Sequence, residues 1–188
     1  MEPEVHIIER YFQLVKRAFT MTNIKCEGGK EIDLLAVDPR EGRRWHVESR
    51  VSTTFPLRME ATYTKDGKCH RNGLDWFKEN KFEHPSIVKK IEELFGCLDY
   101  EKVLVVYTTE VGYDPSWINT AYRRFGIQVW FIMDIIETLK EQIKVVGARD
   151  DVLRLIELIS KTERDREKIF KKITNQVVKS IDTYLRCQ

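Results

Sequence analysis

The chain has 188 residues, of which 42% are hydrophobic and 33% are charged, and this supplies enough apolar material for one domain with a core. Its net charge is only +2, which excludes a uniformly basic nucleic-acid-binding protein, so any such surface must come from local clustering. No apolar run is long enough to cross a membrane and the N-terminus has no signal-peptide pattern, so we expect a cytoplasmic protein without a membrane partner.

The first predicted element is a helix over residues 4–19, because apolar side chains recur there at helical spacing. Glu9 lies beside this apolar stripe, where it is either a solvated helix residue or an acid that points along the sheet. Residues 23–27 are then predicted to form a short strand. Gly28 and Gly29 turn the chain into the next strand, and Lys30 places a cation at its start.

Residues 31–52 are predicted to form a β-hairpin that carries a pair of acids. One strand covers residues 31–37, the other covers residues 44–51, and the residues between them have the composition of a turn. A turn centred between Arg40 and Glu41 places Asp33 roughly opposite Glu48, about 5 Å away. The alternation of the second strand puts His46, Glu48 and Arg50 on one face, and we expect His46 to lie at the surface.

Two carboxylates at such a short distance repel each other, and a bridging divalent cation removes that repulsion. Arg50 follows Glu48 by two residues, so both side chains point to the same face of the strand. From that position the guanidinium can reach a phosphate held at the metal. Two acids and a cation around one point form the arrangement that metal-assisted cleavage of a phosphodiester requires.

The segments GGKEIDLLAV and HVESRVS resemble the core of the PD-(D/E)xK nuclease superfamily, to which many restriction enzymes and archaeal Holliday-junction resolvases belong. Asp33 matches the strand Asp of that pattern, Glu48-Ser49-Arg50 matches (D/E)-x-K with Arg in place of Lys, and Glu9 matches the helix acid. The resemblance is best over residues 4–52 and extends loosely to about residue 144 by order of elements.

This resemblance implies a restriction-endonuclease-like αβββαβ core over residues 1–147. It also implies Mg²⁺ or Mn²⁺ bound between Asp33, Glu48 and the backbone carbonyl of Ser49, with Glu9 assisting and Arg50 on the scissile phosphate. Arginine keeps the positive charge and binds phosphate as a fork, but it is a poor proton acceptor. Arginine in place of lysine is therefore expected to retain phosphate binding. The activity that this replacement affects is catalysis of the cleavage step.

Basic and aromatic side chains interleave over residues 53–83, where we predict a strand at 58–64, a hairpin tip at 65–68 and a helix at 74–81. Such a pattern suits a surface that follows a nucleic-acid backbone and stacks on bases. An insertion whose rings cover the edge of the sheet is the alternative. The residues expected to contact nucleic acid are all basic: Lys30, Arg58, Lys65, Lys68 and Arg71.

Helices predicted at 85–95, 114–124 and 134–144 alternate with apolar strands at 102–108 and 127–132. Strands of nearly continuous apolar composition are buried on both faces and are usually parallel to a neighbour. The fold class expected is therefore α/β, with a central mixed sheet flanked by helices. Residues 148–188 are predicted to form a C-terminal helical extension, either a hairpin packed on the core or a longer helix that pairs with another copy.

Together these features predict a divalent-metal-dependent endonuclease that hydrolyses phosphodiester bonds in DNA, of the repair, recombination or restriction type by resemblance. A second hypothesis, motivated by Arg50, is a nuclease-fold protein that binds nucleic acid or a protein partner without effective cleavage. A third is a plain α/β domain whose acids line an exposed hairpin. A homodimer would supply the two sites that a double-strand cut needs.

Overall fold

The computed structural model describes residues 2–146 and 151–162. The chain divides into two compact units, Met1–Leu139 and Lys140–Gln188, and the sheet and the sites below belong to the first. The domain boundary predicted at residue 147 lies outside the described residues. Of the helical extension predicted over residues 148–188, the described part is residues 151–162, which form a helix as expected.

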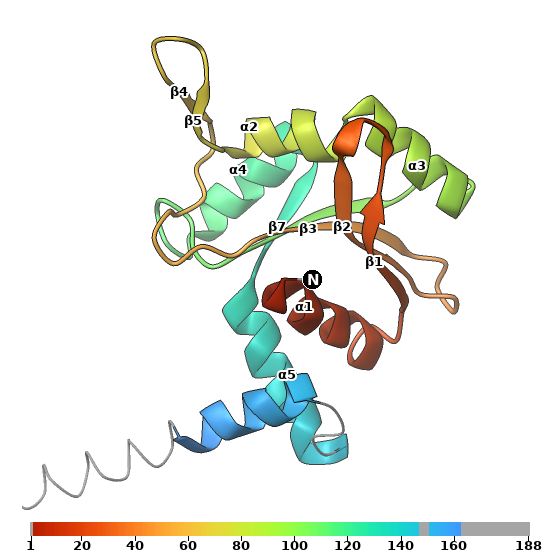
Figure 1. Ribbon diagram of the computed structural model, residues 1–188. Helices are drawn as coiled ribbons and strands as arrows, with labels where there is room; N and C mark the ends of the chain where they lie inside the picture. The colour runs from red at the N-terminus through yellow and green to blue at the C-terminus, as the bar shows by residue number, and fades with distance from the viewer. Residues whose placement is uncertain (1, 147–150, 163–188) are drawn as a thin grey trace, which may run out of the picture. The chain divides into compact units, whose positions relative to one another are not determined.

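A five-stranded mixed sheet, with the order β1-β2-β3-β6-β7, forms the centre of the first unit (Figure 1). The first three strands pair antiparallel, and β3, β6 and β7 run parallel to one another. This confirms the expected α/β class with a central mixed sheet. The strands of this sheet are β1 (Phe19–Lys25), β2 (Glu31–Val37), β3 (Arg44–Arg50), β6 (Glu101–Val106) and β7 (Ile127–Phe131).

Helices cover both faces of this sheet (Figure 1). On one face Phe12 of the first helix packs against Trp45 and Trp130. On the other face the second and fourth helices share a core with β6 and β7, while the third packs on β2. The helices are α1 (Pro3–Leu14), α2 (Leu74–Phe77), α3 (Pro85–Phe95), α4 (Pro115–Phe125) and α5 (Ile132–Val146).

The ends of α3 and α4 follow local signals that the sequence shows directly. Both helices start with a proline, and both end at a glycine in the left-handed region, Gly96 with φ of 70° and Gly126 with φ of 67°. The Asp114 carboxylate also accepts a hydrogen bond from the Ser116 backbone N–H at 2.8 Å, which satisfies one free donor of the first turn of α4. These boundaries agree with the prediction to within one residue.

The N-terminal boundaries predicted from the sequence were wrong. Helix α1 ends at Leu14 instead of residue 19, and β1 starts at Phe19 instead of residue 23. The chain reverses between them through Arg17, which has a positive φ of 54°. A non-glycine residue rarely adopts that conformation, so nothing in the sequence marked the turn.

The segment between β3 and α3 is less regular than predicted. The strand expected at residues 58–64 is reduced to β4 (Thr62–Tyr63), which pairs with β5 (Cys69–Arg71) in a hairpin that projects from the sheet (Figure 1). The predicted tip at 65–68 is confirmed. The helix expected at 74–81 is present as the short α2, which continues directly into a π-helical segment, η2 (Lys78–Phe82). A 3-10 turn, η1 (Glu27–Gly29), connects β1 to β2.

None of the helices in the described part of the chain has both the length and the apolar composition that a membrane span requires.

Candidate active site

The acid pair predicted from the hairpin is present. Leu34 of β2 pairs with Val47 of β3, and continuing this antiparallel register by one residue sets Asp33 opposite Glu48. The Asp33 carboxylate accepts a hydrogen bond from the Ser49 backbone N–H at 2.8 Å, which ties the end of β2 to β3 at this point. The pairing thus confirms the predicted register of the hairpin.

Lys81 contacts both acids, and no motif in the sequence marked this residue. Its Nζ atom lies 2.6 Å from Oε2 of Glu48 and 3.7 Å from Oδ1 of Asp33, and it donates a hydrogen bond to the Glu31 carbonyl at 3.0 Å. Burial alone would lower the pKa of Lys81, but the Glu48 and Asp33 carboxylates outweigh it and hold the pKa above its ordinary value. The lysine is therefore a charged partner shared by both acids.

The position of Lys81 follows from the packing of η2. Phe77 before this segment is nearly fully buried, and Phe82 at its end is fully buried. The π-helical turn closes with a hydrogen bond from the Glu83 N–H to the Lys78 carbonyl at 2.8 Å. Two buried aromatic anchors thus hold the turn against the sheet and direct Lys81 to the acids.

Asp33 has an electrostatic environment that favours its protonated form. Burial raises its pKa first and the Glu48 carboxylate raises it further, while Lys81 and the Ser49 N–H oppose them, and the resulting pKa is about 6. A like charge and desolvation both disfavour the carboxylate. An acid with a pKa near neutrality exchanges a proton readily, which is a property of general acids and bases.

Glu48 is held from its other side by His46. Both side chains are fully buried, and Nε2 of His46 lies 2.9 Å from Oε1 of Glu48. An ionised carboxylate only accepts hydrogen bonds, so we assign the proton to Nε2. The expectation that His46 lies at the surface was therefore wrong, because η2 covers this face of β3 and the Phe82 ring packs 4.8 Å from the His46 ring.

Arg50 shares the strand face of Glu48 but does not join the acids. Its guanidinium is half-buried, and Nη1 has no hydrogen-bond partner among the residues described. Burial lowers the pKa of Arg50, and no acid is among the causes. A half-buried cation without a partner is unfavourable, but the Nη1 atom is itself buried, so an external anion would have to contact another part of this guanidinium.

Glu9 lies away from the cluster. Its Oε1 atom accepts hydrogen bonds from Thr20 at 3.1 Å and from Gln13 at 3.3 Å, on the face of the sheet that α1 covers. Glu48 and His46 point to the opposite face. The structure therefore brings Asp33 and Glu48 together with Lys81 and Ser49, and it does not bring Glu9 to them.

The residues expected to contact nucleic acid are spread over several elements. Lys65 and Lys68 are exposed at the tip of the β4–β5 hairpin, and Lys30 is half-exposed at the start of β2. The Arg71 guanidinium lies 5.3 Å from the centre of the Phe55 ring, and Arg58 lies 4.0 Å from Glu110. Of the five residues expected to contact nucleic acid, Lys65 and Lys68 thus lie together near the exposed Tyr63 of the hairpin.

The donor set at the acid pair fits Mg²⁺ or Mn²⁺ in one specific respect. Mg²⁺ is commonly bound by one or two carboxylates together with water and substrate phosphates, and Asp33 and Glu48 already converge on one cation, the Lys81 ammonium. Within the described ranges, no group of three or more His, Cys, Asp or Glu residues is arranged to hold a metal. A fully protein-made cage is therefore not found there, and two carboxylates are the relevant ligands.

No family model and no curated protein matches this chain. A solved crystal structure of a protein of unknown function, AF1548, is similar to it at 16% sequence identity, with a TM-score of 0.44 over 91% of this chain and 96% of that chain. A likeness at this level supports no conclusion about family or function. The motif-based resemblance therefore stays a prediction, and function has to be derived from the residues.

Proposed function

We propose that this protein is a divalent-metal-dependent endonuclease that hydrolyses phosphodiester bonds in DNA, with its centre at Asp33, Glu48 and Lys81. The observation that carries the proposal is the convergence of these three side chains, which come from β2, β3 and η2. Mg²⁺ or Mn²⁺ would be held by Asp33 and Glu48 and, by the motif resemblance, by the Ser49 carbonyl. The DNA substrate and the cytoplasmic location rest on that resemblance and on the sequence.

Each protein side chain has a role that follows from its position. The bound metal would supply Lewis-acid stabilisation of the negative charge that develops at the phosphate. Lys81 brings the positive charge that the motif expects at position 50. This charge would help to stabilise the negative charge that develops at the phosphate. Asp33 would act as a metal ligand in its ionised form, which a bound divalent cation favours over the protonated form.

Arg50 fits a phosphate-binding role rather than a proton-transfer role. Its guanidinium is fixed at the end of β3 with Nη1 unpaired in the part of the chain that the structure describes. A phosphate would offset the charge of this half-buried side chain through a nitrogen atom other than the buried Nη1, and arginine is well suited to bind phosphate. Glu9 has no role in the proposed centre as the side chains stand.

The cleavage assay is the direct test of this proposal. Supercoiled plasmid and branched DNA are incubated with the protein in Mg²⁺ or Mn²⁺, beside the Glu48→Gln variant and the control Glu92→Gln, which changes an exposed glutamate on α3. We expect cleavage by the wild type and the control, and a loss of at least about 100-fold in Glu48→Gln. Cleavage that persists in Glu48→Gln would contradict the assignment.

A second candidate function is supported by Lys81 itself. The ammonium already offsets one of the two carboxylates, and the raised pKa of Asp33 favours protonation of the other, so the centre does not require a metal to be stable. In that case the protein binds nucleic acid through Arg50 and the hairpin but does not cut it. DNA binding without cleavage in Mg²⁺, Mn²⁺ or Ca²⁺ would favour this function over the nuclease.

A further inference from the structure

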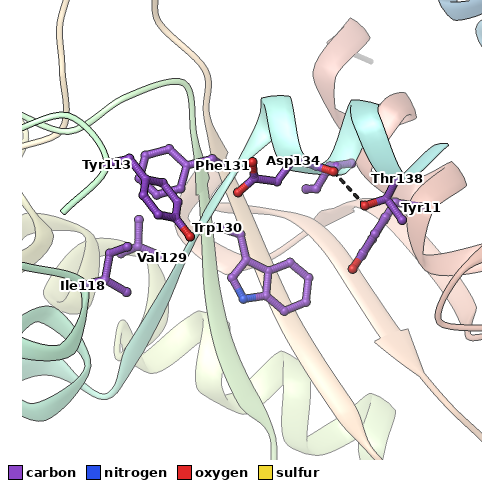
Figure 2. Close-up of a pocket in the computed structure, with 9 residues that line it drawn as sticks. Tyr11, Tyr113, Ile118, Val129, Trp130, Phe131, Asp134 and Thr138 are labelled. Atoms are coloured by element: carbon purple, nitrogen blue, oxygen red, sulfur yellow. Dashed lines mark hydrogen bonds between the residues drawn. The ribbon is translucent and has the colours of Figure 1, made fainter. Parts of the chain in front are cut away.

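A hollow lies at the end of the edge strand β7, and none of its lining residues belongs to the acid cluster of Asp33, Glu48 and Lys81. It has a volume of about 240 Å³ (Figure 2). Its walls include four aromatic side chains and one carboxylate, contributed by α1, β7, α5 and the segment before α4. These residues are Tyr11, Tyr113, Trp130, Phe131 and Asp134.

The aromatic rings meet at steep angles. Tyr11 and Trp130 are inclined by 77° with their centres 5.9 Å apart, and Tyr113 and Phe131 are inclined by 49° with their centres 4.8 Å apart. The near-parallel partner of Trp130 is Phe12, at 13°, which is fully buried behind it. These ring pairs offer no parallel slot for a flat base, and walls at steep angles suit a rounded group.

Trp130 is fixed in place before any ligand arrives. Its indole Nε1–H donates a hydrogen bond to Oε1 of Gln128 at 3.2 Å, and the stack on Phe12 holds the ring plane. The same two rings also contact a cation of the protein that does not line the hollow, because the Lys16 ammonium lies 5.4 Å from the Trp130 ring centre and 5.7 Å from that of Tyr11. Ring faces attract cations through their quadrupole.

Asp134 gives the hollow a negative charge. It lies in the first turn of α5, and its carboxylate makes no hydrogen bond or ion pair with the described residues, while its backbone carbonyl accepts a hydrogen bond from Thr138 at 2.8 Å. Figure 2 shows Asp134, Tyr113 and Trp130 around the same hollow. An unpaired carboxylate beside aromatic rings is complementary to an organic cation.

We propose that this hollow binds an alkylated ammonium group, such as a trimethylammonium group. The methyl groups contact the rings of Tyr11, Tyr113 and Trp130, and the positive charge faces Asp134. Aromatic residues with an acid recognise such cations because the charge is spread over the methyl groups and needs little hydration. The site is independent of the proposed nuclease centre.

Binding is measured by calorimetry and by the shift of the Trp130 indole N–H signal, with choline as the cation and 3,3-dimethylbutan-1-ol as its neutral isostere. We expect choline to bind at least about fivefold more tightly than the isostere, because only choline carries the charge. Equal affinities, or no shift of the Trp130 signal with choline, would overturn the proposal. Binding of a nucleoside monophosphate in place of choline would overturn it too.

Two variants test the residues that carry the proposal. Asp134→Asn removes the charge at constant shape, and Tyr113→Leu removes an exposed ring; Asp99→Asn and Tyr122→Leu are matched controls outside the hollow. We expect Asp134→Asn to weaken choline binding about two- to fivefold, as for a partly exposed ion pair, and Tyr113→Leu to weaken it similarly. Unchanged affinity in both variants would contradict the site.

The source of the cation is resolved by one further ligand. A peptide that carries a single trimethyllysine is compared with choline under the same conditions. Tighter binding of the peptide assigns the ligand to a methylated protein tail, and tighter binding of choline assigns it to a free small molecule. Either order of affinities supports a site for alkylated ammonium, and absence of choline binding overturns the proposal, as stated above.

Discussion

The Nζ atom of Lys81 lies 2.6 Å from Oε2 of the fully buried Glu48. Burying a carboxylate is unfavourable unless a cation or hydrogen-bond donors compensate it. Lys81 supplies the charge and His46 supplies the hydrogen bond, so the buried acid is compensated on both of its oxygens. The stability of the acid pair and its capacity to bind an external cation both depend on this contact.

Replacing Lys81 tests how much the acid pair relies on it. In Lys81→Met the aliphatic stem is kept and the charge is lost, which leaves the fully buried Glu48 and the partly buried Asp33 without their shared cation. We expect the free energy of unfolding at pH 7 to fall by about 1–3 kcal/mol, measured by urea denaturation. Lys89→Met, which removes an exposed lysine paired with Glu27, is the control and should change stability by less than about 0.5 kcal/mol. An equal loss in both variants would show that the Lys81 contact is not special.

The raised pKa of Asp33 predicts a defined pH dependence of stability. The folded value is about 6, above the ordinary value of 3.8, so the folded state binds this proton more tightly than the unfolded state does. The resulting stabilisation is fully present below pH 4 and is lost as the pH rises through 6.

The matched comparison for this pH dependence is Asp33→Asn, which cannot titrate at this position. We expect the unfolding free energy of the wild type, relative to this variant, to decrease by about 2–3 kcal/mol between pH 4 and pH 7. Denaturation curves at half-unit pH steps measure the difference. A flat difference over that range would contradict the raised pKa.

The His46–Glu48 hydrogen bond predicts losses of stability of different size for two substitutions. His46→Leu leaves Oε1 of the buried Glu48 without its donor and should lower the unfolding free energy by about 2–3 kcal/mol. His46→Gln keeps an N–H donor near the Nε2 position and should recover at least half of that loss. Thermal denaturation of both variants measures the effect, and equal losses would mean that ring packing on Phe82, rather than the hydrogen bond, is what matters.

Arg50 is expected to contribute to DNA affinity and not to the stability of the fold. Arg50→Met removes a half-buried charge that has no hydrogen-bond partner for Nη1 among the described residues. The variant should be as stable as the wild type or slightly more stable, within about 1 kcal/mol. Its affinity for duplex DNA should fall. The slope of log affinity against log salt, which is negative, should become shallower by about 1, the value for one phosphate contact. An unchanged slope would exclude a phosphate role for Arg50.

The sequence predicted the features that depend on neighbouring residues. The alternation in β3 separates Trp45 from His46 and Glu48, and the turn between β2 and β3 sets the register, so Asp33 falls opposite Glu48 as expected. The central position of β6 also followed from its apolar run. These are local signals, and each one is contained in a stretch of about ten residues.

The features that were missed depend on contacts between distant segments or on rare backbone conformations. Lys81 reaches the acids from an irregular segment whose path no periodicity reveals, and the same segment buries His46 by placing Phe82 over it. The turn at Arg17 uses a positive φ without a glycine to mark it. The motif also pointed to Arg50 as the cation near the acids, whereas Lys81 occupies that place in space.

Titration of the protein with Mn²⁺ by calorimetry tests the central claim most directly. If Asp33 and Glu48 form a cation centre that Lys81 now fills, the wild type binds one Mn²⁺ per chain, Glu48→Gln binds none, and Lys81→Met binds it more tightly because the ammonium no longer competes. The same Mn²⁺ affinity in all three proteins, or no binding in any of them, would contradict the account.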